Sequence, residues 1–271
     1  MYRGLAILVG AVAWQPKGSS APRLVSRWSE AVPSEPVRAP RPFRKKRPQA
    51  TRVGRGGQQK KLLRVIAGEA RGRRLESPET LLRPMMSRVR EALFSTLLSL
   101  GVFRAPRRVN FLDVFCGSGS VGIEALSRGA DFAAFVDLSR DACDVTTRNA
   151  DACGFGGRHA VICEPAERAL ARDALADRTF DVVALTPPYE EVSYAQLAQA
   201  LVDSPLLNDD AVVVIEYPVE LGSMPPFLGN HRQIVGLRNR RYGRTVLAFY
   251  AKRPTGQLPF DFRHDEFAGG G

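Results

Sequence analysis

From residue 109 to residue 253, short apolar runs alternate with segments of helical period, and this alternation limits the fold more than any other feature. Five runs are each long enough for one strand, and the stretches between them place apolar residues on one helical face. Repeated strand–helix units predict a mostly parallel sheet with helices on both faces, which is an α/β fold. The five runs are VNFLDVF, DFAAFVD, HAVICE, FDVVALT and AVVVIEYP.

Both ends of the chain depart from this alternation. The last two apolar runs, RQIVGLR and TVLAFYA, have no helix between them. We therefore expect an antiparallel hairpin at one edge of a seven-stranded sheet. The expected organisation is a leader over 1–61, a small hairpin-and-helix extension over 62–108, the sheet domain over 109–253 and an irregular tail over 254–271.

Ligands in sheets of this kind bind beyond the carboxyl ends of the strands. The first strand ends in the turn from Asp113 to Gly119, where glycines let a ligand approach the backbone and the next helix offers N–H donors. The second strand ends in Asp137, 24 positions after Asp113, where an acid can bind the ribose of an adenosine. This pattern leaves a dinucleotide, S-adenosylmethionine and a tight turn without a ligand all open.

The third strand ends at Glu164, directly before Pro165. An acid at this place can lie beside the adenine ring of such a cofactor. It can equally be a helix-start acid, because proline is favoured in the first turn of a helix.

The fourth strand ends in Thr186-Pro187-Pro188-Tyr189. The two prolines fix the backbone and remove two N–H donors, so the carbonyls before them remain acceptors at a rigid turn. Tyr189 adds an aromatic face next to these carbonyls. Such a turn can hold a planar group that carries an amine, as in enzymes that flip a base out of its stack. The alternative is a rigid loop without a ligand.

The positive charge is concentrated in the leader. The formal net charge is +11, and residues 1–61 alone carry +12, which leaves −1 for the rest. The leader is rich in Arg, Ser, Ala and Pro, which predicts an organelle transit peptide and a disordered linker, with the chloroplast favoured over the mitochondrion. The alternatives are a secretory signal at Leu5–Trp14 and a basic RNA-binding arm. No apolar run is long enough to span a bilayer, so no membrane partner is expected.

The four cysteines, Cys116, Cys143, Cys153 and Cys163, form no C-x-x-C pair, and only three histidines accompany them. Neither a metal site nor a disulfide framework is expected from this pattern. Free thiols fit a reducing compartment.

Several stretches match one known family over about Leu62 to Lys252. They are RVIAGEARGRRL, RPMMSRVREALFSTL, LDVFCGSGSVGIEALSRGA, the Pro-Pro-Tyr turn and RRYGRTVLAFY. In these stretches the chain resembles the RsmD family of small-subunit ribosomal RNA guanine-N2 methyltransferases, in an organellar-like form with an N-terminal extension. These are class I S-adenosylmethionine-dependent methyltransferases with a Rossmann-like fold. The Asp-x-Phe-Cys-Gly-Ser-Gly block and the Arg-Val-Arg-Glu helix are its most specific parts.

The resemblance implies a protein that uses S-adenosylmethionine to methylate a guanine of ribosomal RNA, with the guanine held at Thr186–Tyr189. We expect this protein to be a monomer. The resemblance places Asp137 on the cofactor's ribose. The chain departs from the family at two positions. Thr186 stands where Asp or Asn is usual. Met85 stands where the family has the threonine of an Arg-Pro-Thr sequence, which here reads Arg83-Pro84-Met85. The residues implied to cradle the cofactor are Asp113, Phe115, Gly117 and Gly119.

Charge within the body indicates where RNA would bind. Residues 62–108 hold 10 Lys and Arg against 4 acids, and residues 232–253 hold 7 basic residues and no acid. Two such islands beside the site would bind phosphates; the alternative is an ordinary solvated surface. The arginines that we expect to contact RNA are Arg71, Arg73, Arg83, Arg88 and Arg241.

The expected reaction is direct transfer of the methyl group to the exocyclic amine, so no cysteine is needed as a nucleophile. Two other functions remain open on the sequence. One is another amino methyltransferase, acting on DNA adenine or on a protein glutamine. The other is a non-catalytic, RNA-binding ribosome assembly factor that keeps the fold.

Overall fold

The computed structural model describes residues 63–79, 85–104, 106–171, 178–189, 192–229 and 232–267. The chain divides into two units, Met1–Gly57 and Gln58–Gly271. The first unit, and with it nearly all of the leader, lies outside the described residues, as do Arg83 and Pro84.

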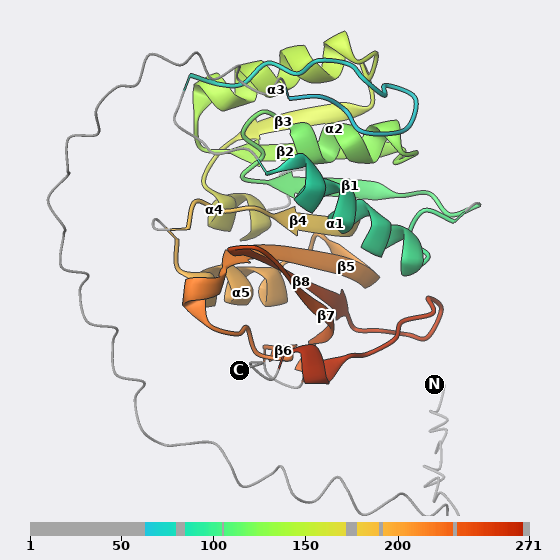
Figure 1. Ribbon diagram of the computed structural model, residues 1–271, viewed down its shortest axis with the longest axis vertical. Helices are drawn as coiled ribbons and strands as arrows, with labels where there is room; N and C mark the ends of the chain where they lie inside the picture. The colour runs from blue at the N-terminus through green and yellow to red at the C-terminus, as the bar shows by residue number, and fades with distance from the viewer. Residues whose placement is uncertain are drawn as a thin grey trace, which may run out of the picture. The chain divides into compact units, whose positions relative to one another are not determined.

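Strands and helices of the second unit follow one another as predicted (Figure 1). The helices are α1 (Ser87–Ser99), α2 (Ser120–Ser127), α3 (Arg140–Ala152), α4 (Ala166–Ala171) and α5 (Tyr194–Asp203). The strands are β1 (Asn110–Val114), β2 (Phe132–Asp137), β3 (His159–Cys163), β4 (Phe180–Leu185), β5 (Leu207–Pro218), β6 (Phe227–Leu228), β7 (Ile234–Tyr242) and β8 (Thr245–Lys252). None of the helices in the described residues is long and apolar enough to cross a membrane.

The strands form one sheet in the order β3-β2-β1-β4-β5-β8-β7-β6. Strands β1 to β5 are parallel to one another, and β8 lies antiparallel between β5 and β7. The predicted mostly parallel sheet with an antiparallel hairpin at one edge is therefore confirmed. Within the described residues the sheet has eight strands instead of the expected seven, because the two residues of β6 also pair with β7. A two-residue strand is too short to show as an apolar run.

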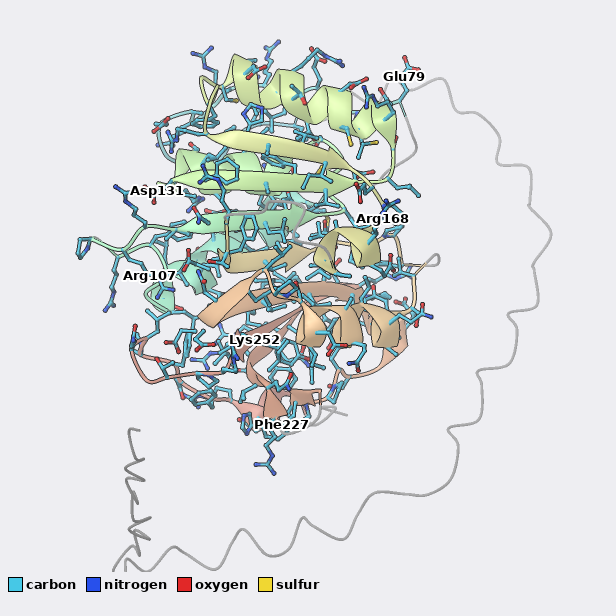
Figure 2. The ribbon with its side chains drawn as sticks, turned by 180° about the vertical axis from the view of Figure 1, so that it is seen from behind. Glu79, Arg107, Asp131, Arg168, Phe227 and Lys252 are labelled. Atoms are coloured by element: carbon cyan, nitrogen blue, oxygen red, sulfur yellow. The ribbon has the colours of Figure 1, made fainter. Side chains whose placement is uncertain are left out.

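Helices cover both faces of the sheet. Helices α1, α2 and α3 lie on one face, and α4 and α5 lie on the other (Figures 1 and 2). Side chains of the first three helices pack in one core, and those of α4 and α5 pack in a second core. Successive residues of β1 point into different cores. Phe111 belongs to the first core and Leu112 to the second, and both are almost completely buried. Burial on both faces explains why the parallel strands read as continuous apolar runs in the sequence.

The beginning of the extension is a small hairpin, as predicted. Val65 N donates to the carbonyl of Arg73 at 3.0 Å, and Gly72 N donates back to the carbonyl of Val65 at 2.9 Å. Together with the bridge between Arg64 and Arg74, these bonds close the turn.

The hairpin is attached to α2 by side chains that are buried in that helix. Both carboxylate oxygens of Glu124 accept backbone N–H groups, from Ile66 at 2.7 Å and from Ala67 at 3.0 Å. Ser127 Oγ donates to the carbonyl of Ala67 at 2.5 Å. A Cβ added to Gly68 would lie 1.7 Å from the carbonyl oxygen of Ser127, so only glycine allows this approach.

Two arginines complete the charge environment of Glu124, which is fully buried. Arg128 Nε lies 2.7 Å from one of its oxygens, and Arg90 Nε lies 3.8 Å from the other. Burial lowers the pKa of the Arg90 guanidinium, and the charge of Glu124 opposes this shift. The hairpin, α1 and α2 are thus joined at one buried acid.

The described part of the tail, which ends at Phe267, is irregular apart from a short helical turn at His264–Phe267. Phe267 is buried against Tyr250 of β8, with the ring centroids 5.3 Å apart. Glu266 accepts a hydrogen bond from the backbone of Asn239 in β7 at 2.9 Å. The tail therefore covers the antiparallel end of the sheet.

Candidate active site

The parallel register brings the ends of several strands to one edge of the sheet. Val114 at the end of β1 lies opposite Val136 in β2 and Leu185 in β4. The residues that directly follow these positions, and therefore share the edge, are Phe115, Asp137 and Thr186. This geometry agrees with the sequence prediction, which placed the motifs together at the carboxyl ends of the strands.

The turn after β1 has three residues in the left-handed region, Phe115 (φ 64), Gly117 (φ 54) and Gly119 (φ 73). Glycine is needed at position 119, because a Cβ there would lie 2.8 Å from Cγ2 of Thr146. Phe115 is not a glycine, and a bulky residue at positive φ stores backbone strain of a kind found at ligand sites. The turn is therefore held in a conformation that the chain does not adopt by local preference.

Helix α3 braces this turn from one side. Thr146 Oγ1 donates to the carbonyl of Gly117 at 3.0 Å, and Asn149 Nδ2 donates to the carbonyl of Ser118 at 2.9 Å. Asn149 also exchanges two hydrogen bonds with the backbone of Glu76, at 2.8 and 3.0 Å. The sequence reasoning missed Thr146 and Asn149. The pattern that could have revealed them is a pair of polar side chains, three positions apart, on the helix face that is directed to the core.

Asp137 fixes the other side of the turn. Its Oδ2 accepts the N–H of Gly117 at 2.9 Å, and its Oδ1 accepts the N–H of Ser139 at 2.9 Å. The residue is only 8% exposed. A carboxylate at the end of β2 next to the glycine turn is placed where the sequence predicted an acceptor for ribose hydroxyls.

Asp113 lies beneath the start of α2 and is completely buried. Its Oδ2 accepts the N–H of Gly122 at 2.8 Å, whereas its Oδ1 has no hydrogen-bond partner within the described part of the chain. Burial raises the pKa of this carboxyl to about 8, the hydrogen bond from Gly122 opposes the shift, and the charge of Asp137 adds to it. Asp113 thus supports the helix start and keeps one unpaired oxygen.

The chemistry of these groups fits S-adenosylmethionine. The cap position of α2 is Gly119, which has no side chain, so the helix start can offer N–H donors to the carboxylate of the methionine part. The unpaired Oδ1 of Asp113 can serve a polar group of the same part, and Asp137 can serve the ribose.

Thr186 ties the end of β4 to the glycine turn. Its Oγ1 donates to the carbonyl of Phe115 at 3.2 Å, and its backbone N–H donates to the carbonyl of Val114 at 3.2 Å. Pro187 is buried, and Pro188 and Tyr189 are partly exposed. The threonine hydroxyl thereby holds the strained Phe115 in place, a role that sequence reasoning did not foresee.

The Tyr189 side chain is held at its hydroxyl. This hydroxyl donates to Oε1 of Glu216 at 2.7 Å and lies 3.2 Å from Oγ1 of Thr245. Glu216 lies near the end of β5, and Thr245 begins β8. Sequence reasoning missed both residues, although the rule of strand ends, applied to the run AVVVIE, would have found Glu216.

Glu164 follows β3 directly and pairs with Arg168 of α4, at 3.4 Å between Oε2 and Nε. Figure 2 shows Arg168 toward the same end of the strands as Glu79, opposite to Arg107 and Asp131. A contact between an acid just before α4 and an arginine in that helix accords with the helix-start interpretation. The adenine contact of Glu164 stays a prediction.

The predicted RNA contacts lie at two ends of the sheet. Arg71 and Arg73 are exposed in the hairpin that contacts Ser127, the last residue of α2. Helix α2 starts at the carboxyl edge and runs back, so these two arginines lie toward the amino ends of the strands. The structure does not bring them to Thr186–Tyr189.

The remaining arginines differ in position. Arg88 is exposed in the first turn of α1, whose far end leads into β1, so its first turn lies toward the carboxyl edge. Arg241 is exposed at the turn between β7 and β8, and Thr245 of that turn pairs with Pro218 at the end of β5. Arg241 therefore lies at the carboxyl edge, while Arg83 lies outside the described residues.

The cysteines form no disulfide among the described residues. All four lie in that part of the chain, and each is a free thiol. Burial raises the pKa of the Cys116 thiol well above its usual range. Within the described ranges no group of His, Cys, Asp and Glu side chains is arranged to hold a metal ion.

Comparison with known proteins gives consistent matches over this unit. A family model described as conserved hypothetical protein 95 matches residues 63–251. The Bacillus subtilis protein YlbH is 33% identical over 70% of this chain and 100% of its own length. The Escherichia coli ribosomal RNA small subunit methyltransferase D is 29% identical over 73% of this chain and 94% of its own. The solved structure of Escherichia coli yhhF superposes with a TM-score of 0.60 at 28% identity, over 70% of this chain and 98% of that one.

Proposed function

Because the chain belongs to the RsmD family of methyltransferases, we propose that it methylates the N2 amine of a guanine in small-subunit ribosomal RNA of an organelle. It is a methyltransferase, and its cofactor is S-adenosylmethionine. The observation that carries the substrate proposal is the position of Tyr189. Its ring is anchored at the same sheet edge as the glycine turn, beside the rigid Pro187-Pro188 backbone.

When bound, S-adenosylmethionine supplies an electrophilic methyl group for direct transfer. The chain holds it through the glycine turn, with Asp137 on the ribose, Asp113 beneath the helix start and Glu164 toward the adenine. Fixing two reactants next to each other can contribute roughly 7–11 kcal/mol to a barrier reduction. Positioning of this kind is the main contribution that we assign to the protein.

The target base is held by the turn after β4. A flipped guanine stacks on Tyr189, and its exocyclic amine donates to the carbonyl oxygen of Pro187. The hydroxyl of Thr186 donates to Phe115, and its oxygen can still accept a hydrogen bond from the amine. A threonine can therefore fill, at shorter reach, the acceptor role of the Asp or Asn that is usual in the family.

An RNA partner is supported by the basic residues of this edge and by the name of the Escherichia coli relative, a ribosomal RNA small subunit methyltransferase. Arg88 and Arg241 are exposed at the carboxyl edge of the sheet and can bind phosphates. The turn after β4 would then bind the target guanine, and the contacts of the arginines with phosphates would orient the RNA toward that turn.

The proposal is tested by methyl transfer from labelled S-adenosylmethionine to naked rRNA and to small ribosomal subunits, followed by nucleoside analysis. We expect label in N2-methylguanosine. Label in adenine or in protein glutamine would indicate another amino methyltransferase. Tight RNA binding without transfer to any RNA would indicate an assembly factor, and either result would overturn the proposal.

We also propose that residues 1–61 are a transit peptide followed by a linker, because they carry the excess of positive charge and none of the site residues. Fused to a fluorescent protein, they should direct it into chloroplasts. A mitochondrial signal would correct the organelle. A diffuse cytosolic or a secreted signal would overturn the transit proposal.

A further inference from the structure

The hydroxyl of Tyr189 joins three separate elements. The tyrosine follows β4, its stronger partner Glu216 belongs to β5, and its second partner Thr245 opens β8. The 2.7 Å bond ends on a carboxylate, and hydrogen bonds to charged acceptors are stronger than those between neutral groups. The far end of the ring is therefore fixed by two strands that carry none of the sequence motifs for catalysis.

One of these partners belongs to the basic turn between β7 and β8. Thr245 pairs with Tyr242 across that turn and with Pro218 across β5. The turn carries Arg241 and Arg244, both exposed. The tyrosine hydroxyl thus touches the same short segment that presents arginines at the carboxyl edge.

We infer that Glu216 and Thr245 are positioning residues, which set the plane of the Tyr189 ring and link it to the basic β7–β8 turn. The inference rests on the proposed function, in which the target guanine stacks on Tyr189. Neither residue needs to touch the base, since both act through the tyrosine hydroxyl.

The physical reason lies in how a tyrosine ring can move. The side chain has two rotatable bonds, and its root is fixed by the Pro187-Pro188 backbone. Hydrogen bonds at the far end of the ring remove the remaining freedom. A base stacked on a ring of fixed plane presents its amine in one direction, and misplacement by about 1 Å can lower a rate on the order of 100-fold.

The inference predicts a loss of rate without a matching loss of binding. Tyr189→Phe keeps the stacking face and removes the anchor, and Glu216→Ala removes the main acceptor. Each should lower the single-turnover methylation rate of an rRNA substrate roughly tenfold, the effect of one hydrogen bond to a charged group. Dissociation constants for the RNA and for S-adenosylhomocysteine should change by less than about twofold, because the lost interaction acts on the reacting geometry.

Three further variants separate positioning from a general structural effect. Glu216→Gln keeps an acceptor oxygen and should recover most of the rate, and Thr245→Val should cost less than Glu216→Ala. Tyr194→Phe is the matched control, since it removes a tyrosine hydroxyl that donates to the backbone carbonyl of Glu216, at 3.3 Å, and leaves the Glu216 carboxylate in place. It should leave the methylation rate unchanged.

A double-mutant cycle gives the decisive comparison. Tyr189→Phe combined with Glu216→Ala should be no slower than the worse single variant, because both remove the same bond. Multiplicative losses, or wild-type rates in Glu216→Ala, would overturn the inference while the proposed function stands. Absence of transfer to any RNA by the wild-type protein would instead overturn the proposed function, and this inference with it.

Discussion

Thr186 has a structural task in addition to its proposed place beside the substrate. Its hydroxyl donates to the carbonyl of Phe115, the one residue of the glycine turn after β1 that is at positive φ without being a glycine. Thr186→Ala should therefore loosen the turn and weaken binding of S-adenosylhomocysteine by about 1 kcal/mol, the worth of one neutral hydrogen bond. Calorimetry checks this, with Thr186→Ser as the control that keeps the hydroxyl. Equal affinities of the two variants would contradict the role.

The buried carboxyl of Asp113 should make stability depend on pH. Its pKa in the folded protein is about 8, above the ordinary value of 3.8, so folding favours the protonated form. This contribution to the free energy of unfolding is fully present below about pH 4 and is lost as the pH rises to about 8. Asp113→Asn removes it and keeps an acceptor for Gly122.

Melting temperatures of wild type and Asp113→Asn at pH 5 and pH 8 test this dependence. The melting temperature of Asp113→Asn, relative to that of the wild type, should be higher at pH 8 than at pH 5. Asp144→Asn, on the exposed face of α3, controls for the loss of a surface charge. A constant difference between the two proteins across this range would mean that Asp113 is not buried as an uncharged group.

At the scale of elements, two costs can be separated in the hairpin that is attached to α2. One is the cost of a positive φ, and the other is the cost of losing the close approach to Ser127. Gly68 and Gly72 are both at positive φ, near 84° and 82°, but only Gly68 faces a neighbour, the carbonyl of Ser127. Gly72→Ala should cost about 1 kcal/mol for the backbone conformation alone. Gly68→Ala should cost clearly more and should release residues 63–75, which hydrogen exchange would show as faster exchange. Equal costs would mean that the approach to Ser127 is not retained in solution.

The alternation of apolar runs predicted the elements well, because strands buried on both faces leave a strong and local signal. Contacts between distant residues leave no such signal. Glu124 reads as an ordinary polar residue of a helix, yet it accepts N–H groups from residues 57 and 58 positions away. Thr245 was missed for the same reason, since it lies 56 positions further along the chain than Tyr189.

At the scale of the molecule, the family match begins at residue 63, and the chain divides after Gly57. A chain beginning at Gln58 should therefore keep the melting temperature of the full protein and its affinity for S-adenosylhomocysteine. Scanning calorimetry and titration calorimetry measure the two. Loss of cofactor binding on truncation would show that the leader belongs to the folded enzyme.

The arginines at the two ends of the sheet should respond differently to the length of the RNA. Arg88→Ala with Arg241→Ala should weaken binding of a short rRNA fragment and lower the salt slope by about one for each phosphate that is no longer neutralised. Arg71→Ala with Arg73→Ala should affect only substrates long enough to reach the amino ends of the strands. Titrations with a fragment and with whole subunits compare the pairs, and equal effects on the fragment would contradict this placement.

Asn149 is bound on one side to the carbonyl of Ser118 in the cofactor turn and on the other to the backbone of Glu76 in the extension. Whatever orders one of these segments lowers the entropy that remains to be lost in ordering the other. Binding energies are reciprocal, so an RNA that tightens the protein's hold on S-adenosylmethionine is itself held more tightly, by the same factor, when S-adenosylmethionine is present. If RNA orders the extension at Glu76, the Asn149 amide transmits this order to the glycine turn, and the joint residence of RNA and S-adenosylmethionine on the protein is favoured.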